Sequence, residues 1–177
     1  MLTIHFNLNK VIMIFIMIKW KFLSLLILVA LLSCARVIDA NNYKPLEGKT
    51  YAIIPFENYT DTPLAGYRVA SIVEGVLRSK GYRVERLWTY KEMEPTKQEL
   101  EEMMERAKEV ADYVVYGTVN EYRYKTGIDG EPAVSISLFI IESSTGKVVF
   151  GSSLSASGWA HQSLGTLTQD LVRKVLR

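Results

Sequence analysis

The only cysteine of the chain, Cys34, stands in a sequence that bacteria use to attach lipid to a thiol. It follows Leu31-Leu32-Ser33, which puts an aliphatic residue three positions before the cysteine and a small residue directly before it. The apolar run Phe22 to Leu32 lies behind a positive segment that contains Lys19 and Lys21. Such a run fits a secretory signal and is too short to span a membrane. We predict cleavage before Cys34 and acylation of its thiol with fatty acids such as palmitate; the alternative is an uncleaved anchor with a buried cysteine.

Few other residues offer catalytic chemistry. The cleaved chain keeps one histidine, His161, so it lacks the several imidazoles of a histidine metal site, and no nucleophile-elbow motif accompanies it for a Ser-His-Asp triad. Asp129 and Glu131 are paired carboxylates of the kind that glycosidases use, but Gly127 and Gly130 favour a turn there. The sequence also has no glycine-rich phosphate loop. These residues predict no enzyme, no metal site and no cofactor.

Cleavage at this point divides the chain into three parts. Residues 1–33 form a signal peptide, with Met17 as an alternative start, residues 34–48 form a lipidated tether, and residues 49–177 form one domain. The signal peptide removes three of the 21 lysines and arginines and no acid, so 18 basic and 19 acidic side chains remain, a formal charge of −1. A near-neutral chain without a basic cluster gives no reason to expect a nucleic-acid partner. Ala35, where inner-membrane lipoproteins commonly carry Asp, favours the outer membrane.

Hydrophobic periodicity predicts an α/β domain in the order β-α-β-α-β-β-β-α. Strands are expected over 51–56, 82–88, 113–125, 132–141 and 147–154, and helices over 63–80, 96–111 and 161–176. Thr62 is the expected N-cap of the first helix, with Pro63 in its first turn, and residues 57–62 are expected to form a polar loop. Thr96 and Glu99 form a capping box for the second helix. One mixed sheet of about five strands with about three helices, in a three-layer-like single domain, fits this order.

Two surface features have alternative interpretations. Trp159 follows Gly158 in a stretch of small residues, where an exposed aromatic ring anchors at a lipid interface or stacks on a sugar; burial in the core is the alternative. Between Lys91 and Asp112 the chain has eight acids and four bases, which indicates either a solvated helix face or an acidic surface for a cationic client.

The end of the strand over 113–125 is dense in aromatic and charged groups. Its residues are Tyr122, Arg123, Tyr124 and Lys125. They are typical either of an edge strand protected by charges or of a contact between subunits.

Several motifs together resemble a known family. Residues 51–60 read YAIIPFENYT, a strand ending in P-F-x-N-x-T that is similar to the start of periplasmic domains such as those of CsgG, LpoB and TolB. The stretches TPLAGYRVA (62–70), EYRYKTGIDGEPAV (121–134) and SGW (157–159) are more specific. Over essentially the whole mature domain, the chain resembles the PelC family, outer-membrane lipoproteins of Pel exopolysaccharide export.

The resemblance implies a non-enzymatic ring of identical subunits, a dodecamer, on the periplasmic face of the outer membrane. Such a ring works beside the PelB export barrel and guides a cationic amino-sugar polymer over an electronegative surface. The acids expected to form that surface stand at strand ends: Asp112, Glu121, Asp129 and Glu131, with those of 92–109 as second choice. The resemblance also implies that Trp159 faces the lipid or the ring mouth.

Two other functions remain as alternatives to this interpretation. An LpoB-like activator of a peptidoglycan synthase has to reach across the periplasm, and a tether of about 14 residues is short for that. A glycan hydrolase is the more distant alternative, because the catalytic residues discussed above are missing.

Overall fold

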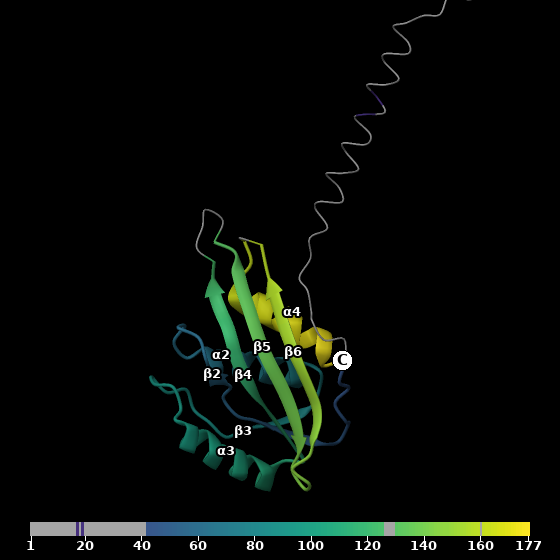
Figure 1. The fold of residues 1–177 in the computed structure, drawn as a ribbon. Helices are drawn as coiled ribbons and strands as arrows, with labels where there is room; N and C mark the ends of the chain where they lie inside the picture. The colour runs from purple at the N-terminus through teal and green to yellow at the C-terminus, as the bar shows by residue number, and fades with distance from the viewer. Residues whose placement is uncertain (1–16, 18, 20–41, 126–129, 160) are drawn as a thin grey trace, which may run out of the picture. The chain divides into compact units, whose positions relative to one another are not determined.

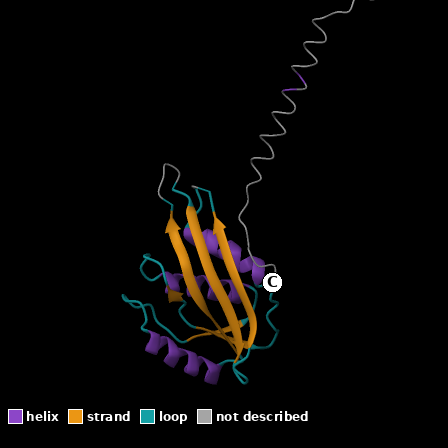
Figure 2. Ribbon diagram, in the orientation of Figure 1, coloured by secondary structure: helices purple, strands orange, loops and turns teal. Residues whose placement is uncertain are grey.

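A mixed sheet between two helical layers organises the domain (Figures 1 and 2). The computed structural model describes Met17, Lys19 and residues 42–125, 130–159 and 161–177. The strands are β1 (Thr50–Ile53), β2 (Glu57–Asn58), β3 (Arg83–Arg86), β4 (Tyr113–Tyr124), β5 (Pro132–Glu142) and β6 (Val148–Ser157). The helices from residue 42 onward are α2 (Ala65–Ser79), α3 (Lys97–Val110) and α4 (Leu164–Val175). This arrangement confirms the predicted α/β class, its mixed sheet and its three helices.

The sheet joins a parallel half to an antiparallel half. Its order is β3-β1-β4-β5-β6, with β1 parallel to both β3 and β4, and with β4, β5 and β6 forming an antiparallel meander. β2 adds a short parallel pairing with β4, in which Glu57 lies opposite Thr118 and Asn58 opposite Val119. The prediction of a loop over 57–62 was therefore wrong at Glu57 and Asn58.

The side chain of Asn58 explains why its neighbourhood looked like a loop. Its Oδ1 accepts hydrogen bonds from the backbone N–H of Thr60 at 3.0 Å and from the Thr60 hydroxyl at 2.8 Å. Its Nδ2 donates to the carbonyl oxygen of Thr62 at 2.9 Å. Local bonds of this kind are typical of turns. The N-x-T part of the first motif thus shapes the turn between β2 and α2.

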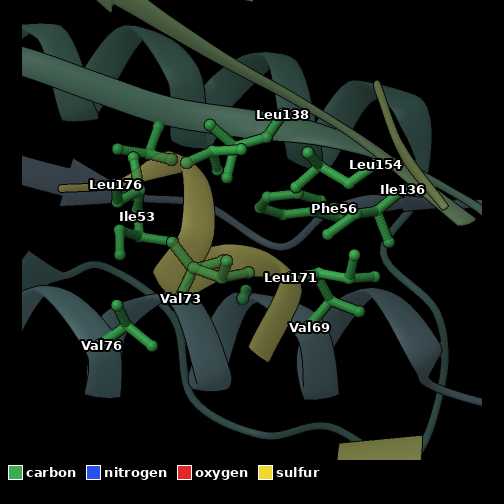
Figure 3. Packing of buried hydrophobic residues seen from close by; sticks show 14 of the residues in the cluster. Ile53, Phe56, Val69, Val73, Val76, Ile136, Leu138, Leu154, Leu171 and Leu176 are labelled. Atoms are coloured by element: carbon green, nitrogen blue, oxygen red, sulfur yellow. The ribbon is translucent and has the colours of Figure 1, made fainter. Parts of the chain in front are cut away.

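The alternation of side chains along β1 separates two cores. Tyr51 and Ile53 point into a large core that β4, β5 and β6 share with α2 and α4. Ala52 and Ile54 point to the other face, where they meet Ala107 of α3. Figure 3 shows the larger core from close by, where α2 and α4 meet the inner face of the sheet. Consequently α2 and α4 cover one face of the sheet and α3 covers part of the other, which makes three layers.

A β-bulge at Asn120 changes the phase of β4. Val119 pairs with Ile136, but Glu121 pairs with the adjacent Ser135, so Asn120 has no partner in the ladder. An extra residue on one strand moves every later side chain to the opposite face. The inward positions therefore pass from odd residues such as Val119 to Tyr122, whose exposed fraction is 3%.

The first helix starts later than its capping signal suggested. Its N-cap is Leu64, in the left-handed region with φ 59°, and no side chain caps it. The hydroxyl of Thr62 instead donates a hydrogen bond to the carbonyl oxygen of Tyr122. The prediction of Thr62 as N-cap was wrong, because a strand distant in the sequence uses its hydroxyl. The capping box of Thr96 and Glu99 at α3 is confirmed.

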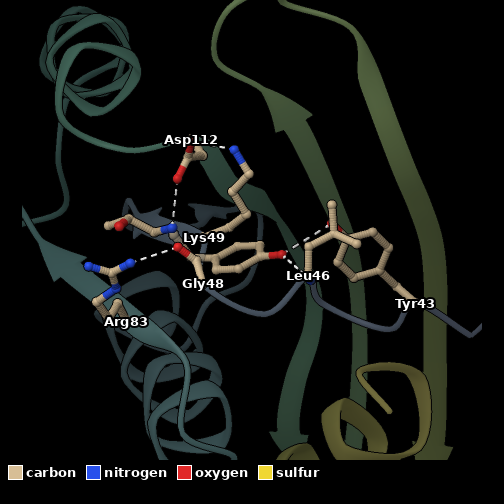
Figure 4. Close-up of polar contacts among 8 residues, drawn as sticks. Tyr43, Leu46, Gly48, Lys49, Arg83 and Asp112 are labelled. Carbon is tan, nitrogen blue, oxygen red and sulfur yellow. Dashed lines mark hydrogen bonds and ion pairs between the residues drawn. The ribbon is translucent and has the colours of Figure 1, made fainter.

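The predicted tether is in part attached to the domain. Tyr43 forms a parallel β-bridge with Leu176: its N–H donates to the carbonyl of Val175 at 2.7 Å, and its own carbonyl accepts from Arg177 at 2.9 Å. The hydroxyl of Tyr51 accepts from the N–H of Leu46 at 2.8 Å (Figure 4). Tyr43 and Leu46, which lie within the predicted tether, are therefore packed on the domain.

Candidate functional site

Most of the candidate residues gather at one end of the sheet. This region, called the hairpin end below, comprises the described residues 121–125, 130–133 and 157–159, around the end of β4, the start of β5 and the end of β6. Two backbone hydrogen bonds hold it together. The N–H of Lys125 donates to the backbone carbonyl oxygen of Glu131 at 2.7 Å, and the N–H of Gly158 donates to the carbonyl oxygen of Pro132 at 2.8 Å. The candidate residues that belong to this region are Glu121, Arg123, Tyr124, Lys125, Glu131 and Trp159. Asp129, which the sequence also assigns here, lies outside the described residues.

The charges at the hairpin end are paired weakly. Glu121 lies 3.0 Å from the guanidinium of Arg123, and Glu131 lies 3.9 Å from the ammonium of Lys125. All four side chains are at least one third exposed. Exposed pairs of this kind contribute about 0–1 kcal/mol, because water and salt screen them. These carboxylates therefore stay available to another cation.

Two aromatic rings stand at the same end. Trp159 is 50% exposed and Tyr124 is 49% exposed. The backbone of Trp159 is held in a turn, since its N–H donates to the Gln162 side chain at 2.9 Å and its carbonyl accepts from the Gln162 N–H at 2.9 Å. The structure thus answers the question of burial for Trp159: the ring is half exposed in the single chain.

Tyr122 does not belong with its neighbours on the surface. The bulge at Asn120 turns its side chain into the core, so it is no candidate for a subunit contact. Arg123, Tyr124 and Lys125 stay exposed and keep that interpretation.

Asp112 lies at the opposite end of the sheet, where it braces two segments (Figure 4). Its carboxylate accepts from the backbone N–H of Thr50 at 2.9 Å and from the ammonium of Lys49 at 3.0 Å. The hydrogen bond from Thr50, followed by the charge of Lys49, holds the pKa of the Asp112 carboxyl below its usual value. Asp112 is already engaged within its own chain, so we assign it a structural role.

The 92–109 region contains two acids that are more exposed than the described candidates at the strand ends. Glu101 and Glu105 on α3 are 68% and 71% exposed, and their intrachain partners, Lys97 at 3.9 Å and Lys108 at 2.7 Å, lie on the same helix. α3 itself carries five acids and three bases, so its exposed side is an acidic helix surface.

A cluster of charge on the other face was not predicted from the sequence. Glu74 of α2 is 6% exposed, and its carboxylate accepts from the Nε atoms of Arg78 at 2.8 Å and Arg86 at 2.7 Å. Arg86 also lies over the ring of Trp88, 4.5 Å from its centroid. The i,i+4 spacing of Glu74 and Arg78 was a readable signal, whereas the approach of Arg86 depends on the packing of β3.

The described residues offer little further chemistry. Within them, no group of three or more His, Cys, Asp or Glu side chains could hold a metal ion. Among the same residues, no helix has both the length and the apolar character needed to cross a membrane.

Comparison with known proteins places the chain in a family. No family model and no curated protein matches it. Among solved structures it is similar to a PelC dodecamer from Paraburkholderia phytofirmans, with 33% identity over 80% of this chain and 94% of that one and a TM-score of 0.65. An L103M variant of the same PelC dodecamer gives 32% identity and a TM-score of 0.63 over the same shares.

A more distant likeness concerns the fold alone. The lipoprotein GNA1162 from Neisseria meningitidis is 19% identical over 71% of this chain and 96% of that one, with a TM-score of 0.50. The identity of 33% over 80% of this chain and 94% of a PelC chain is the finding that shows the family. The chain belongs to the PelC family.

Proposed function

We propose that this chain is a lipid-anchored subunit of a non-enzymatic ring that guides a cationic exopolysaccharide of the Pel type to an export pore in the outer membrane. One observation carries the proposal: the chain shares 33% identity over 94% of the length of a PelC that forms a dodecamer. In this proposal Cys34 carries the lipid, and the ring stands at the periplasmic face of the membrane beside a PelB-type barrel.

The hairpin end supplies the surface that meets the polymer. The segment 121–131 has three acids, Glu121, Asp129 and Glu131, and two bases, Arg123 and Lys125. Because the described ion pairs are exposed and weak, the ammonium groups of a polymer compete for the carboxylates. Repeating these acids around a ring concentrates negative potential near its axis, and a charged concavity raises the local concentration of cations.

The exposed aromatic rings give this end a second role. Trp159 and Tyr124 stand together with the acids, and aromatic side chains of this kind anchor at the boundary between lipid and water. We therefore place the hairpin end at the ring mouth, facing the membrane or the pore.

Two measurements test this function. The full-length protein, purified in detergent, should have the mass of a large closed oligomer by mass photometry; a monomer at micromolar concentration would contradict the ring. In cells that export such a polymer, Asp129→Lys combined with Glu131→Lys should leave protein level and assembly intact but strongly reduce the secreted polymer.

A matched control places the same change of charge at the other end of the sheet. Glu47→Lys combined with Glu142→Lys alters two exposed or half-exposed acids near the start of β1 and the end of β5. This control should export normally. Equal loss in both double variants would show that net charge, and not the hairpin end, matters.

A further inference from the structure

Opposite faces of the domain carry opposite charge. Residues 65–86, which contain α2 and β3, have five basic and two acidic side chains, whereas residues 91–112, which contain α3, have eight acidic and four basic ones. The two core clusters show that α2 and α3 lie on different sides of the sheet. The folded chain is therefore positive on its α2 face and negative on its α3 face.

The positive face is held in a fixed shape. The buried carboxylate of Glu74 binds Arg78 and Arg86, yet the two arginine side chains stay 50% and 43% exposed. A guanidinium has five N–H donors, so each arginine keeps donors for a further acceptor. Guanidinium groups that are already fixed lose little conformational entropy when they bind a carboxylate.

A hollow of about 370 Å³ opens beside Arg86. Its lining includes Arg68, Ser71, Arg86 and Tyr67. Tyr67 has no exposed surface, and its hydroxyl has no hydrogen-bond partner among the described residues. Burial raises the pKa of this hydroxyl, so it stays protonated and can donate. A buried hydroxyl without a partner is destabilising, so an acceptor that reaches it gains a hydrogen bond.

The outer surface of α2 also allows close approach. Ser71, Gly75 and Ser79 are exposed and follow one another at four-residue spacing, so they form one row of small residues. A Cβ atom on Gly75 would meet nothing within 4 Å, so the chain itself does not require glycine there. Glycine inside a helix is destabilising relative to alanine.

α3 presents a row that complements this surface. Glu101, Glu105 and Glu109 are exposed and are also spaced by four residues. From the helical rise, this row is about 12 Å long, against about 15 Å between Arg68 and Arg78 on α2. A ridge of four-residue spacing packs into a groove of the same spacing in the commonest class of helix contact.

We propose that the glutamate ridge of α3 in one copy docks on the α2 face of the next copy, with one carboxylate entering the hollow at Tyr67, Arg68 and Arg86. The inference rests on the ring of the proposed function and names the surfaces that join its subunits. Contact between two different faces is head-to-tail, which is the type that closes rings. A symmetric contact of either face with itself would instead bring like charges together.

Two charge-reversal variants of the full-length protein test the contact. Arg68→Glu with Ser71→Glu removes the positive net charge of residues 65–86 and puts two carboxylates at the hollow. Glu101→Lys with Glu105→Lys makes the α3 ridge positive. None of the four residues is buried, so both variants should keep the circular dichroism and melting behaviour of a folded domain. Each variant alone should have the mass of a single chain in detergent. An equimolar mixture should recover the large oligomer, because alternating copies then match at every contact.

The outcomes separate this inference from the ring itself. If the unaltered protein is a monomer, the ring of the proposed function is contradicted, and the contact between α2 and α3 is contradicted with it. If the unaltered protein assembles and each variant still assembles alone, α2 and α3 do not meet. If both variants are folded monomers and their mixture stays monomeric, complementary charge does not join them.

A variant without any change of charge gives an independent check. Gly75→Leu should raise the melting temperature of the chain, because it removes a helical glycine at an open position, and should abolish the oligomer by filling the groove. Gly165→Leu is the matched control on α4, where a Cβ meets its nearest neighbour at an ordinary 3.8 Å. The control should assemble normally; normal assembly of Gly75→Leu would overturn the proposed contact.

Discussion

Gly66 of α2 lies directly against the carbonyl oxygen of Phe56, so close that a Cβ atom on the glycine would be 1.9 Å from that oxygen. In return, the N–H of Phe56 donates to the carbonyl of Gly66 at 3.3 Å. The side chain of Phe56 is fully buried between the sheet and the helices (Figure 3). This contact between two backbones sets the distance between α2 and the chain that leaves β1.

We predict that Gly66→Ala destabilises the domain by about 1–3 kcal/mol or more, because the methyl group forces the helix away from Phe56. Gly75→Ala, in the same helix but with open space around it, should instead stabilise the chain by about 0.5–1 kcal/mol. Urea unfolding of both variants, with the slope compared as well as the midpoint, measures the difference. Similar effects of the two substitutions would contradict the close approach at Gly66.

Trp88 and Trp159 should respond in opposite ways to truncation. Trp88 is 6% exposed, and its indole N–H donates to the carbonyl of Ile53 at 3.1 Å, so Trp88→Ala should cost about 3–5 kcal/mol. Trp159→Ala should change the free energy of unfolding by no more than about 0.5 kcal/mol, since the ring is half exposed. A loss of several kcal/mol at Trp159 would place that ring in the core.

Acid should weaken the N-terminal turn of α3. Lys91 at 2.7 Å, followed by the backbone and side chain of Thr96, lowers the pKa of the Glu99 carboxyl from its usual 4.5 to about 2. A lowered pKa in the folded state stabilises the fold above the unfolded value, and this contribution disappears as the pH falls from about 4.5 to about 2. The melting temperature should therefore fall less steeply over this range in Glu99→Gln than in the unaltered protein. Equal slopes would contradict the assignment.

Asp112 should prove structural. Asp112→Asn keeps an acceptor for Thr50 but loses the charge that binds Lys49, so the melting temperature should fall modestly while export per folded protein stays unchanged. Lys49→Met is the matched change on the partner. If Asp112→Asn abolished export at an unchanged melting temperature, the acid would belong to the polymer path.

Local signals of the sequence were reliable wherever both partners of an interaction lie close together in the chain. Thr96 and Glu99 are three residues apart, and this spacing correctly predicted the capping box of α3. Thr62 carried a signal just as clear, but a distant carbonyl, that of Tyr122, takes its hydroxyl. No local pattern reveals such a competitor.

The remaining differences come from pairing between strands. The two residues of β2 are a strand only because Thr118 and Val119 lie beside them. The alternation Val115, Gly117, Val119 extended to Tyr122 would put this tyrosine on the outer face. The bulge that reverses it depends on the register with β5, which the sequence does not display. The sequence also showed a charged group made up of Glu121, Arg123 and Lys125. It did not show that Trp159 lies beside them, because that position depends on the pairing of the strands.

The β-bridge between Tyr43 and Leu176 also has a mechanical consequence. A force applied to the chain before residue 43 is transmitted to the domain through the hydrogen bonds of Tyr43 with Val175 and Arg177. The load passes from there to α4 and the sheet on which it packs, and does not first stretch β1. Tyr43 and the last helix are therefore expected to move together when force is applied to the chain ahead of the domain.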